Sequence, residues 1–166
     1  TNAARAYYDA HADSFTTDAW QVRWATVDSS KITARAPKND ELETWYEGHR
    51  AEFARLDPAG GGIQTRPFAD VKPLVDLRWR AEQRAFEARR LADELATAWA
   101  KNKSGPSSRA IETGGPTWLV MGGLVPNGLS HELADSARSW SEPHALVLGD
   151  PKGFQVVGMV RHEPKF

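Results

Sequence analysis

The sequence lacks cysteine, any excess of charge of one sign and any long apolar run, and each absence excludes a class of protein. Without cysteine the chain forms no disulfide, has no thiol nucleophile and binds no metal through thiolates. Its 21 basic and 22 acidic residues leave a net charge of −1. This balance argues against a nucleic-acid-binding protein, whose affinity rests on Lys and Arg paired with phosphate. No apolar stretch approaches the roughly 18 residues of a membrane-spanning helix.

Branched aliphatic residues are scarce, and alanine and tryptophan take their place. Leu, Ile, Val and Phe together make up 31 of the 166 residues, against 24 alanines and 7 tryptophans. This composition predicts a thin core in which alanines pack against aromatic rings. The first residue is Thr1 rather than Met, and we expect that a segment upstream of it was removed: a signal, an anchor, or sequence beyond an artificial boundary.

One pattern of aromatic residues and histidine occurs twice, in residues 7–15 and 38 positions later in residues 45–53. The shared positions are Tyr8/Tyr46, His11/His49 and Phe15/Phe53, and Tyr7 corresponds to Trp45. Residues at i, i+4 and i+8 lie on one face of a helix, so each copy predicts a short amphipathic helix. Asp40 and Glu43 have the spacing of a capping box before the second copy.

Three further elements are expected in the first hundred residues. The alternation of residues 20–27 predicts a half-buried strand between the two copies. Pro58 and three consecutive glycines predict a flexible loop over residues 57–66. Residues 68–101 predict a helix on the order of 50 Å long, which favours an elongated molecule. Its apolar seam comprises Leu74, Leu77, Ala81, Ala88, Leu91, Leu95 and Ala98.

The residues beyond about 103 have the pattern of strands and turns. We expect strands at 117–121, 145–148 and 154–161, the last two forming a hairpin, and a helix at 130–138 with Ser130 as its N-cap. The pairs Gly114-Gly115 and Gly122-Gly123 are interpreted as turn signals. The predicted fold is therefore α+β and mainly helical. It comprises a helical domain over residues 1–103, with two related helix units and one strand, and a small α+β domain over 104–166.

Motifs that carry chemistry are not found. His131 and Glu132 begin a zinc-protease pattern, but Asp135 stands where the second histidine would be needed. His11 and His49 each follow a carboxylate by two residues, and we favour packing over a shared metal or proton site. No nucleophile elbow, phosphate loop or dinucleotide motif is present. The sequence therefore predicts no catalytic residue, no metal, no cofactor and no small-molecule substrate.

The aromatic residues are the remaining candidates for function. Seven tryptophans are many to bury in so thin an aliphatic core, so we expect several to lie at an interface. Trp20 and Trp24 share one face of the predicted strand, and the second helical copy brings three more aromatic side chains. The predicted polypeptide-binding residues are Trp20, Trp24, Trp45, Tyr46 and Phe53.

Several segments resemble the SurA/PpiD-type folding factors of the bacterial cell envelope. Residues 7–15 followed by 20–27 look like their repeated chaperone unit, residues 68–75 like the start of their long helix, and residues 153–164 like their closing strand. These factors combine helical chaperone segments with parvulin prolyl-isomerase domains. Residues 122–160 are similar to the second half of such a domain, and the first half is absent. His144 and His162 are available for its polar site, without the strand that would complete it, so isomerase activity is not expected.

The resemblance implies a non-catalytic, chaperone-like or scaffold module that binds unfolded or partly folded polypeptides. It also implies a location in the periplasm or at the periplasmic face of a membrane. One alternative is a structural accessory subunit permanently bound to a membrane-protein complex. A second is a peptidyl-prolyl isomerase whose catalytic domain lies outside this chain.

Overall fold

The computed structural model describes residues 2–14 and 16–164, and its contacts divide the chain into two compact units. Thr1–Lys31 and Ala88–Phe166 form the first, called here the sheet unit. Ile32–Glu87 form the second, called the inserted unit because the chain leaves the sheet unit and returns to it. The predicted α+β class is confirmed. The predicted boundary at residue 103 does not match this division.

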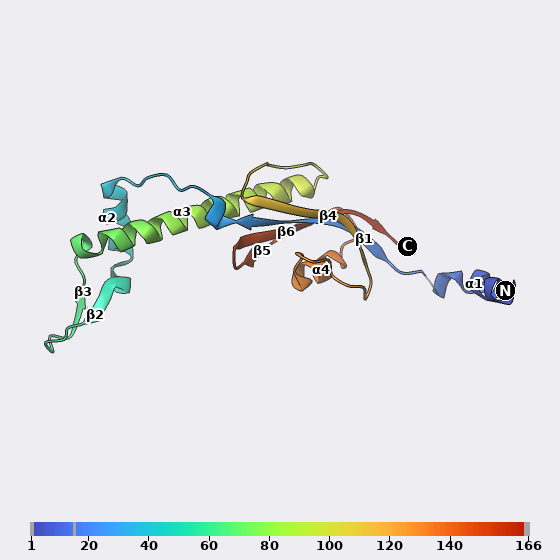
Figure 1. Cartoon of the computed structure of the whole chain (residues 1–166), viewed down its shortest axis with the longest axis horizontal. Helices are drawn as coiled ribbons and strands as arrows, with labels where there is room; N and C mark the ends of the chain where they lie inside the picture. Colours follow the sequence, from blue (N-terminus) through green and yellow to red (C-terminus); the bar gives the residue numbers. More distant parts are fainter. Residues whose placement is uncertain (1, 15, 165–166) are drawn as a thin grey trace. The chain divides into compact units, whose positions relative to one another are not determined.

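The sheet unit contains a four-stranded antiparallel sheet in the order β4-β1-β6-β5 (Figure 1). The strands are β1 (Ala19–Asp28), β4 (Ile111–Val120), β5 (Ala145–Asp150) and β6 (Gly153–Glu163). The predicted strands at 20–27, 145–148 and 154–161 are confirmed, and β4 begins earlier than predicted. Because β1 pairs with both β4 and β6, the N-terminal strand belongs to the same unit as the C-terminal residues. This pairing is the reason that the division into units does not fall at residue 103.

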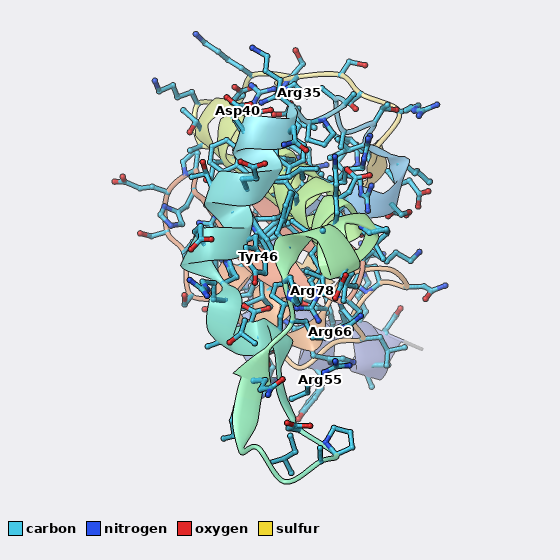
Figure 2. All side chains as sticks on the ribbon, turned by 90° about the vertical axis from the view of Figure 1, so that its left-hand side faces the viewer. Arg35, Asp40, Tyr46, Arg55, Arg66 and Arg78 are labelled. Atoms are coloured by element: carbon cyan, nitrogen blue, oxygen red, sulfur yellow. The ribbon has the colours of Figure 1, made fainter. Side chains whose placement is uncertain are left out.

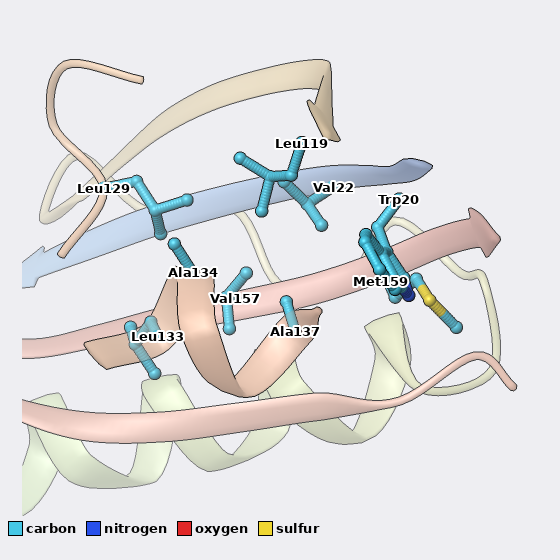
Figure 3. Packing of buried hydrophobic residues seen from close by; sticks show 9 residues of the cluster. All are labelled: Trp20, Val22, Leu119, Leu129, Leu133, Ala134, Ala137, Val157 and Met159. Atoms are coloured by element: carbon cyan, nitrogen blue, oxygen red, sulfur yellow. The ribbon is translucent and has the colours of Figure 1, made fainter. Parts of the chain in front are cut away.

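The sheet is covered on both faces. Helix α4 (His131–Ala137) packs on one face, and its N-cap is Ser130, whose hydroxyl accepts a hydrogen bond from the Leu133 N–H at 3.2 Å, as predicted. The cluster on this face, drawn in Figure 3, comprises Trp20, Val22, Leu119, Leu129, Leu133, Ala134, Ala137, Val157 and Met159. On the other face Gly158 faces Trp99 of α3 (Phe68–Trp99), and a β-carbon at Gly158 would lie 2.9 Å from the Trp99 Cβ. Successive strand residues point to opposite faces, so the two sets alternate along β6.

The inserted unit is built around the first part of α3. Its other elements are α2 (Asn39–Gly48), a 3-10 turn η3 (Arg50–Phe53), β2 (Ala54–Leu56) and β3 (Ile63–Thr65). Its core comprises Leu42, Tyr46, Phe53, Val71, Val75 and Trp79. The loop predicted over 57–66 is partly wrong, because β2 and β3 form an antiparallel hairpin and only residues 57–62 turn. Strands of three residues are too short for an alternating pattern to be visible in the sequence.

The long helix α3 is confirmed, but its predicted seam is only partly buried. Ala88, Leu91 and Leu95 lie in the interior, whereas the Leu77 side chain is 61% exposed. Toward the N-terminal end the buried positions are instead Val71, Val75 and Trp79. No helix in the described part of the chain has the length and hydropathy to cross a membrane.

Helix α2 begins at Asn39, one residue before the expected N-cap Asp40. Its N-cap is Lys38, and the Glu41 carboxylate accepts a hydrogen bond from the Lys38 N–H at 2.8 Å. The Asp40–Glu43 capping box is therefore wrong, since Glu41 occupies the N3 position. Glu41 also accepts a hydrogen bond from Arg35 Nη1 at 2.8 Å. This contact, followed by the bond from Lys38, lowers the pKa of Glu41 to about 2.

The repeated pattern is a motif that ends a helix. His11 follows α1 (Asn2–Ala10) and His49 follows α2, so the α-helix stops just before the histidine in each copy. The His11 ring stacks on Tyr7 with centroids 4.2 Å apart, and the His49 ring stacks on Trp45 at 3.8 Å. Each Nδ1 lies 2.8 or 2.7 Å from the carbonyl oxygen of the same aromatic residue. A 3-10 turn follows in both copies, η1 (Ala12–Ser14) and η3; Phe15 lies outside the described residues.

Candidate functional site

The aromatic residues predicted to bind polypeptide lie mainly in the two cores. Trp20, Tyr46 and Phe53 are at most 5% exposed, and Trp24 and Trp45 are half-buried. Trp20 and Trp24 belong to the sheet unit, and the other three to the inserted unit. Trp20, Tyr46 and Phe53, predicted as polypeptide-binding residues, are therefore core residues in this structure, with little of each side chain accessible to a polypeptide. Residue type alone does not distinguish a core tryptophan from an interfacial one, since both roles suit its large apolar ring.

Trp20 shows why such a ring can be buried. Its Nε1–H donates a hydrogen bond to the Trp140 carbonyl at 2.8 Å, so the polar atom of the indole is satisfied inside the protein. Its ring also stacks on His162 of β6, with centroids 5.0 Å apart and the planes 12° from parallel. Tyr46 is buried in the same manner, with its hydroxyl donating to the Arg66 carbonyl at 2.6 Å. Both residues are structural members of their cores.

Trp24 packs against the glycine pair that the sequence interpretation assigned to a turn. Gly114 and Gly115 lie inside β4, and a β-carbon at Gly114 would lie 2.6 Å from the Trp24 Nε1, within the indole itself. Gly115 has φ +84°, and its β-carbon would lie 2.8 Å from the Val22 carbonyl oxygen. Interpreting this pair as a turn was wrong, because the glycines provide space for the Trp24 ring.

A substitution at Gly114 tests the fit between this glycine and the Trp24 ring. Gly114→Ala is expected to lower the free energy of unfolding by about 1–3 kcal/mol, because the new methyl group overlaps the indole. In a Trp24→Leu background, Gly114→Ala should lower the free energy of unfolding by a clearly smaller amount, because the leucine side chain is shorter than the indole. Urea denaturation of the four proteins in this double-mutant cycle measures the coupling. Equal costs of Gly114→Ala in both backgrounds would contradict the assignment.

The sheet face on the α4 side is the place where a parvulin-like site was considered. β1 lies beside β6 as its antiparallel neighbour. His162 is stacked on Trp20, and His144 precedes β5 with its ring against Trp140 at 4.8 Å. The polar group on this face is Gln155, 5% exposed. Its amide donates to the Gly128 carbonyl at 2.9 Å and accepts from the Ser130 N–H at 2.7 Å.

This face is therefore filled by apolar side chains and a fully engaged amide. Among residues 2–14 and 16–164, no group of three or more His, Asp or Glu side chains is arranged to hold a metal ion. His131 and Glu132, at the start of α4, are both exposed.

The exposed apolar side chains are aliphatic or belong to Tyr and Phe. All seven tryptophans are buried or half-buried. The exposed set comprises Tyr7, Tyr8, Leu56, Ile63, Leu77, Phe86, Met121, Leu124 and Leu146. In the sheet unit, Leu124 is 96% exposed in a loop beside Gly122 and Gly123. In the inserted unit, two members of the set face each other across the β2–β3 hairpin.

This hairpin, residues 54–65, is called here the hairpin arm. Leu56 pairs with Ile63, and each side chain is 75% exposed. Arg55 pairs with Gln64 and so lies on the opposite face of the two strands. Arg66 follows β3, and its N–H donates to the Phe53 carbonyl at 3.0 Å. The arm therefore has an aliphatic face and a basic face.

The basic face has more positive than negative charge available to a partner. Within the described residues, the guanidinium groups of Arg55 and Arg66 make no ion pair or hydrogen bond. Figure 2 shows Arg78, Arg66 and Arg55 in succession from α3 along the arm. Arg78 is bound to Glu52 at 2.7 Å and covers the Phe53 ring at 5.2 Å.

The acidic residue at the turn of the arm is engaged locally. The Asp57 carboxylate accepts hydrogen bonds from the Ala59 N–H at 2.9 Å and from Gln64 Nε2 at 3.0 Å. Sequence reasoning missed the arm, although one aliphatic residue on each side of the glycine-rich turn, Leu56 and Ile63, was an available signal. Comparison of the chain with protein-family models, with curated proteins and with solved structures finds no match.

Proposed function

We propose that this chain is a non-catalytic polypeptide-binding module, chaperone-like or scaffold in character, and that the hairpin arm is its binding surface. The observation that carries the proposal is the cross-strand pair Leu56 and Ile63, each 75% exposed. Burying both side chains under a partner would contribute about 3–5 kcal/mol. Such an exposed pair on a sheet open at both edges favours an extended apolar polypeptide as ligand.

Charge narrows the class of polypeptide. Arg55 and Arg66 are available to pair with carboxylates, and the Asp57 charge is held by the turn. A ligand with acidic residues beside apolar ones satisfies both faces of the arm. The resemblance of residues 7–15, 20–27, 68–75 and 153–164 to SurA/PpiD-type factors supports a place in the bacterial cell envelope, at the periplasmic side.

A second candidate function is an accessory subunit permanently bound to one membrane-protein complex. The small size of the exposed pair favours it, because two aliphatic side chains suit one defined contact better than a broad range of clients. Suppression of aggregation of unrelated unfolded proteins would support the chaperone-like role. Co-purification with one membrane complex in fixed stoichiometry would support the subunit. Acceleration of prolyl-peptide isomerisation by the purified chain would overturn both.

The test removes the aliphatic pair. The variant Leu56→Ser/Ile63→Ser is expected to weaken binding to a permanently unfolded, reduced and alkylated acidic protein by about tenfold or more, measured by calorimetry. Its thermal unfolding should stay close to that of the wild type, because both side chains are exposed.

The matched control is Leu124→Ser, which removes an exposed leucine from the sheet unit and should leave binding unchanged. Arg55→Glu/Arg66→Glu should weaken binding of the acidic ligand and spare a neutral one. Wild-type affinity in the serine double variant would refute the arm as the binding surface.

A further inference from the structure

The two edges of the four-stranded sheet differ in how they are protected against pairing with another strand. The strand order places β4 at one edge and β5 at the other (Figure 1). β4 has Pro116 near its middle, which offers no N–H, and its pairing with β1 contains a register shift. β5 contains neither proline nor lysine, and its pairing with β6 is regular. The β5 edge therefore lacks the features that keep a strand from accepting a further one.

The register of β5 shows which of its backbone groups are free. The Met159 N–H donates to the His144 carbonyl at 2.9 Å, and these residues continue the β5–β6 register. Pairs that exchange hydrogen bonds alternate along an antiparallel ladder, so Ala145, Val147 and Gly149 direct their N–H and C=O groups away from β6. In the described part of the chain these groups have no other hydrogen-bond partner. At Gly149 a β-carbon would meet no atom within 4 Å.

The segment around β5 is complementary to its own reverse. Residues 142–152 read Glu-Pro-His-Ala-Leu-Val-Leu-Gly-Asp-Pro-Lys, with Val147 at the centre. In two such segments that run antiparallel about this centre, the His144 imidazole lies opposite the Asp150 carboxylate. Glu142 and Lys152 take corresponding places further out, again with opposite charges. Imidazole can donate a hydrogen bond or carry a positive charge, so the pair with Asp150 is favourable across two strands.

We propose that β5 is a self-association edge, through which two copies of this chain pair β5 with β5, antiparallel about Val147, and join their sheets. In this register the free groups of Val147 in one copy face those of Val147 in the other, and Ala145 faces Gly149. The contact is the same surface on both copies, as a twofold-symmetric dimer requires.

The flanking prolines favour this register over its neighbours. Pro143 and Pro151 lie opposite each other when the strands are centred on Val147, and their missing N–H groups end the ladder at both ends. A shift of two residues would place Pro143 opposite Gly149, or Pro151 opposite Ala145, and lose hydrogen bonds there. The backbone groups of β5 alone would suit any extended polypeptide. The matched charges and prolines favour a second copy as the occupant.

Sedimentation velocity of the full chain over a dilution series tests the proposal. Because the paired strands are short, we expect a dimer with a dissociation constant on the order of ten micromolar. Val147→Pro removes the central N–H, which faces away from β6, so no hydrogen bond within the sheet is lost. This variant should weaken dimerisation about tenfold or more. Leu124→Ser, in an exposed loop of the sheet unit, should dimerise like the wild type.

A charge exchange tests the register without relying on a proline. His144→Asp places two carboxylates opposite each other and should weaken the dimer about fivefold or more. His144→Asp/Asp150→Lys restores opposite charges between copies and should recover most of the affinity. Within one chain these positions are six residues apart along the strand, roughly 20 Å, so a rescue cannot arise inside a single copy. Far-ultraviolet circular dichroism checks that each variant is folded.

The outcomes that would overturn the proposal are distinct. A chain that stays monomeric up to millimolar concentration refutes it, and so does a dimer that is unaffected by Val147→Pro and His144→Asp. Weakening by His144→Asp without rescue in the double variant would refute the register. A dimer lost in Leu56→Ser/Ile63→Ser would assign the contact to the hairpin arm instead. The proposal uses no residue of that arm, so either can fail without the other.

Discussion

Replacing Trp20 by alanine is expected to lower the free energy of unfolding by about 3–5 kcal/mol. The side chain is 2% exposed and is the largest member of the cluster between the sheet and α4 (Figure 3). Truncation leaves a cavity there and also removes the N–H donor of the Trp140 carbonyl. His162 loses the ring on which it stacks. Urea denaturation followed by far-ultraviolet circular dichroism measures the change.

Trp20→Phe is the matched control for this prediction. It keeps an aromatic ring in the core and removes the hydrogen bond, so its cost should lie well below that of alanine. A Trp20→Ala protein with wild-type stability and lost polypeptide binding would contradict the structure. Trp20 would then act as a polypeptide-binding residue, as its residue type had suggested.

Replacing Phe53 by alanine is expected to destabilise the inserted unit by about 3–5 kcal/mol. The ring is 3% exposed, packs on Tyr46 with centroids 5.5 Å apart, and lies beneath the Arg78 guanidinium. Its loss leaves a cavity in a core with six buried members. Native-state hydrogen exchange is the suitable measurement, because it reports each unit separately. Amides of α2 should lose protection.

The neighbouring residue Leu56 provides the control, since it is three positions along the chain and 75% exposed. Leu56→Ser should leave the protection of α2 unchanged. Equal loss of protection in both variants would mean that the hairpin arm supports the core, and the arm would then no longer qualify as a free binding surface.

Local signals in the sequence were sufficient for the elements that depend on near neighbours. Ser130 caps α4, the β5–β6 hairpin closes as expected, and α3 runs from Phe68 to Trp99. Each follows from residues within a few turns or a few positions of one another. The α+β class followed from the same patterns.

Long-range packing decided the features that the sequence did not reveal. Gly114 and Gly115 have the composition of a turn, and only the position of Trp24 explains them as part of a strand. The burial of Trp20 depends on a carbonyl 120 residues away. The sequence suggested aromatic binding residues, whereas the candidate residues in the structure are aliphatic. The reason is that residue type does not determine whether a side chain is exposed.

The central position of β1 has a consequence for cleavage of the chain. Because the inserted unit begins and ends within the sheet unit, one proteolytic cut in the turn over residues 57–62 would release no fragment. One fragment would retain β1 and the other β4 and β6, and the hydrogen bonds of the sheet would hold the two together. A force that a ligand applies to the hairpin arm is therefore shared by the two covalent connections between the inserted unit and the sheet unit. A domain at the end of a chain has only one such connection.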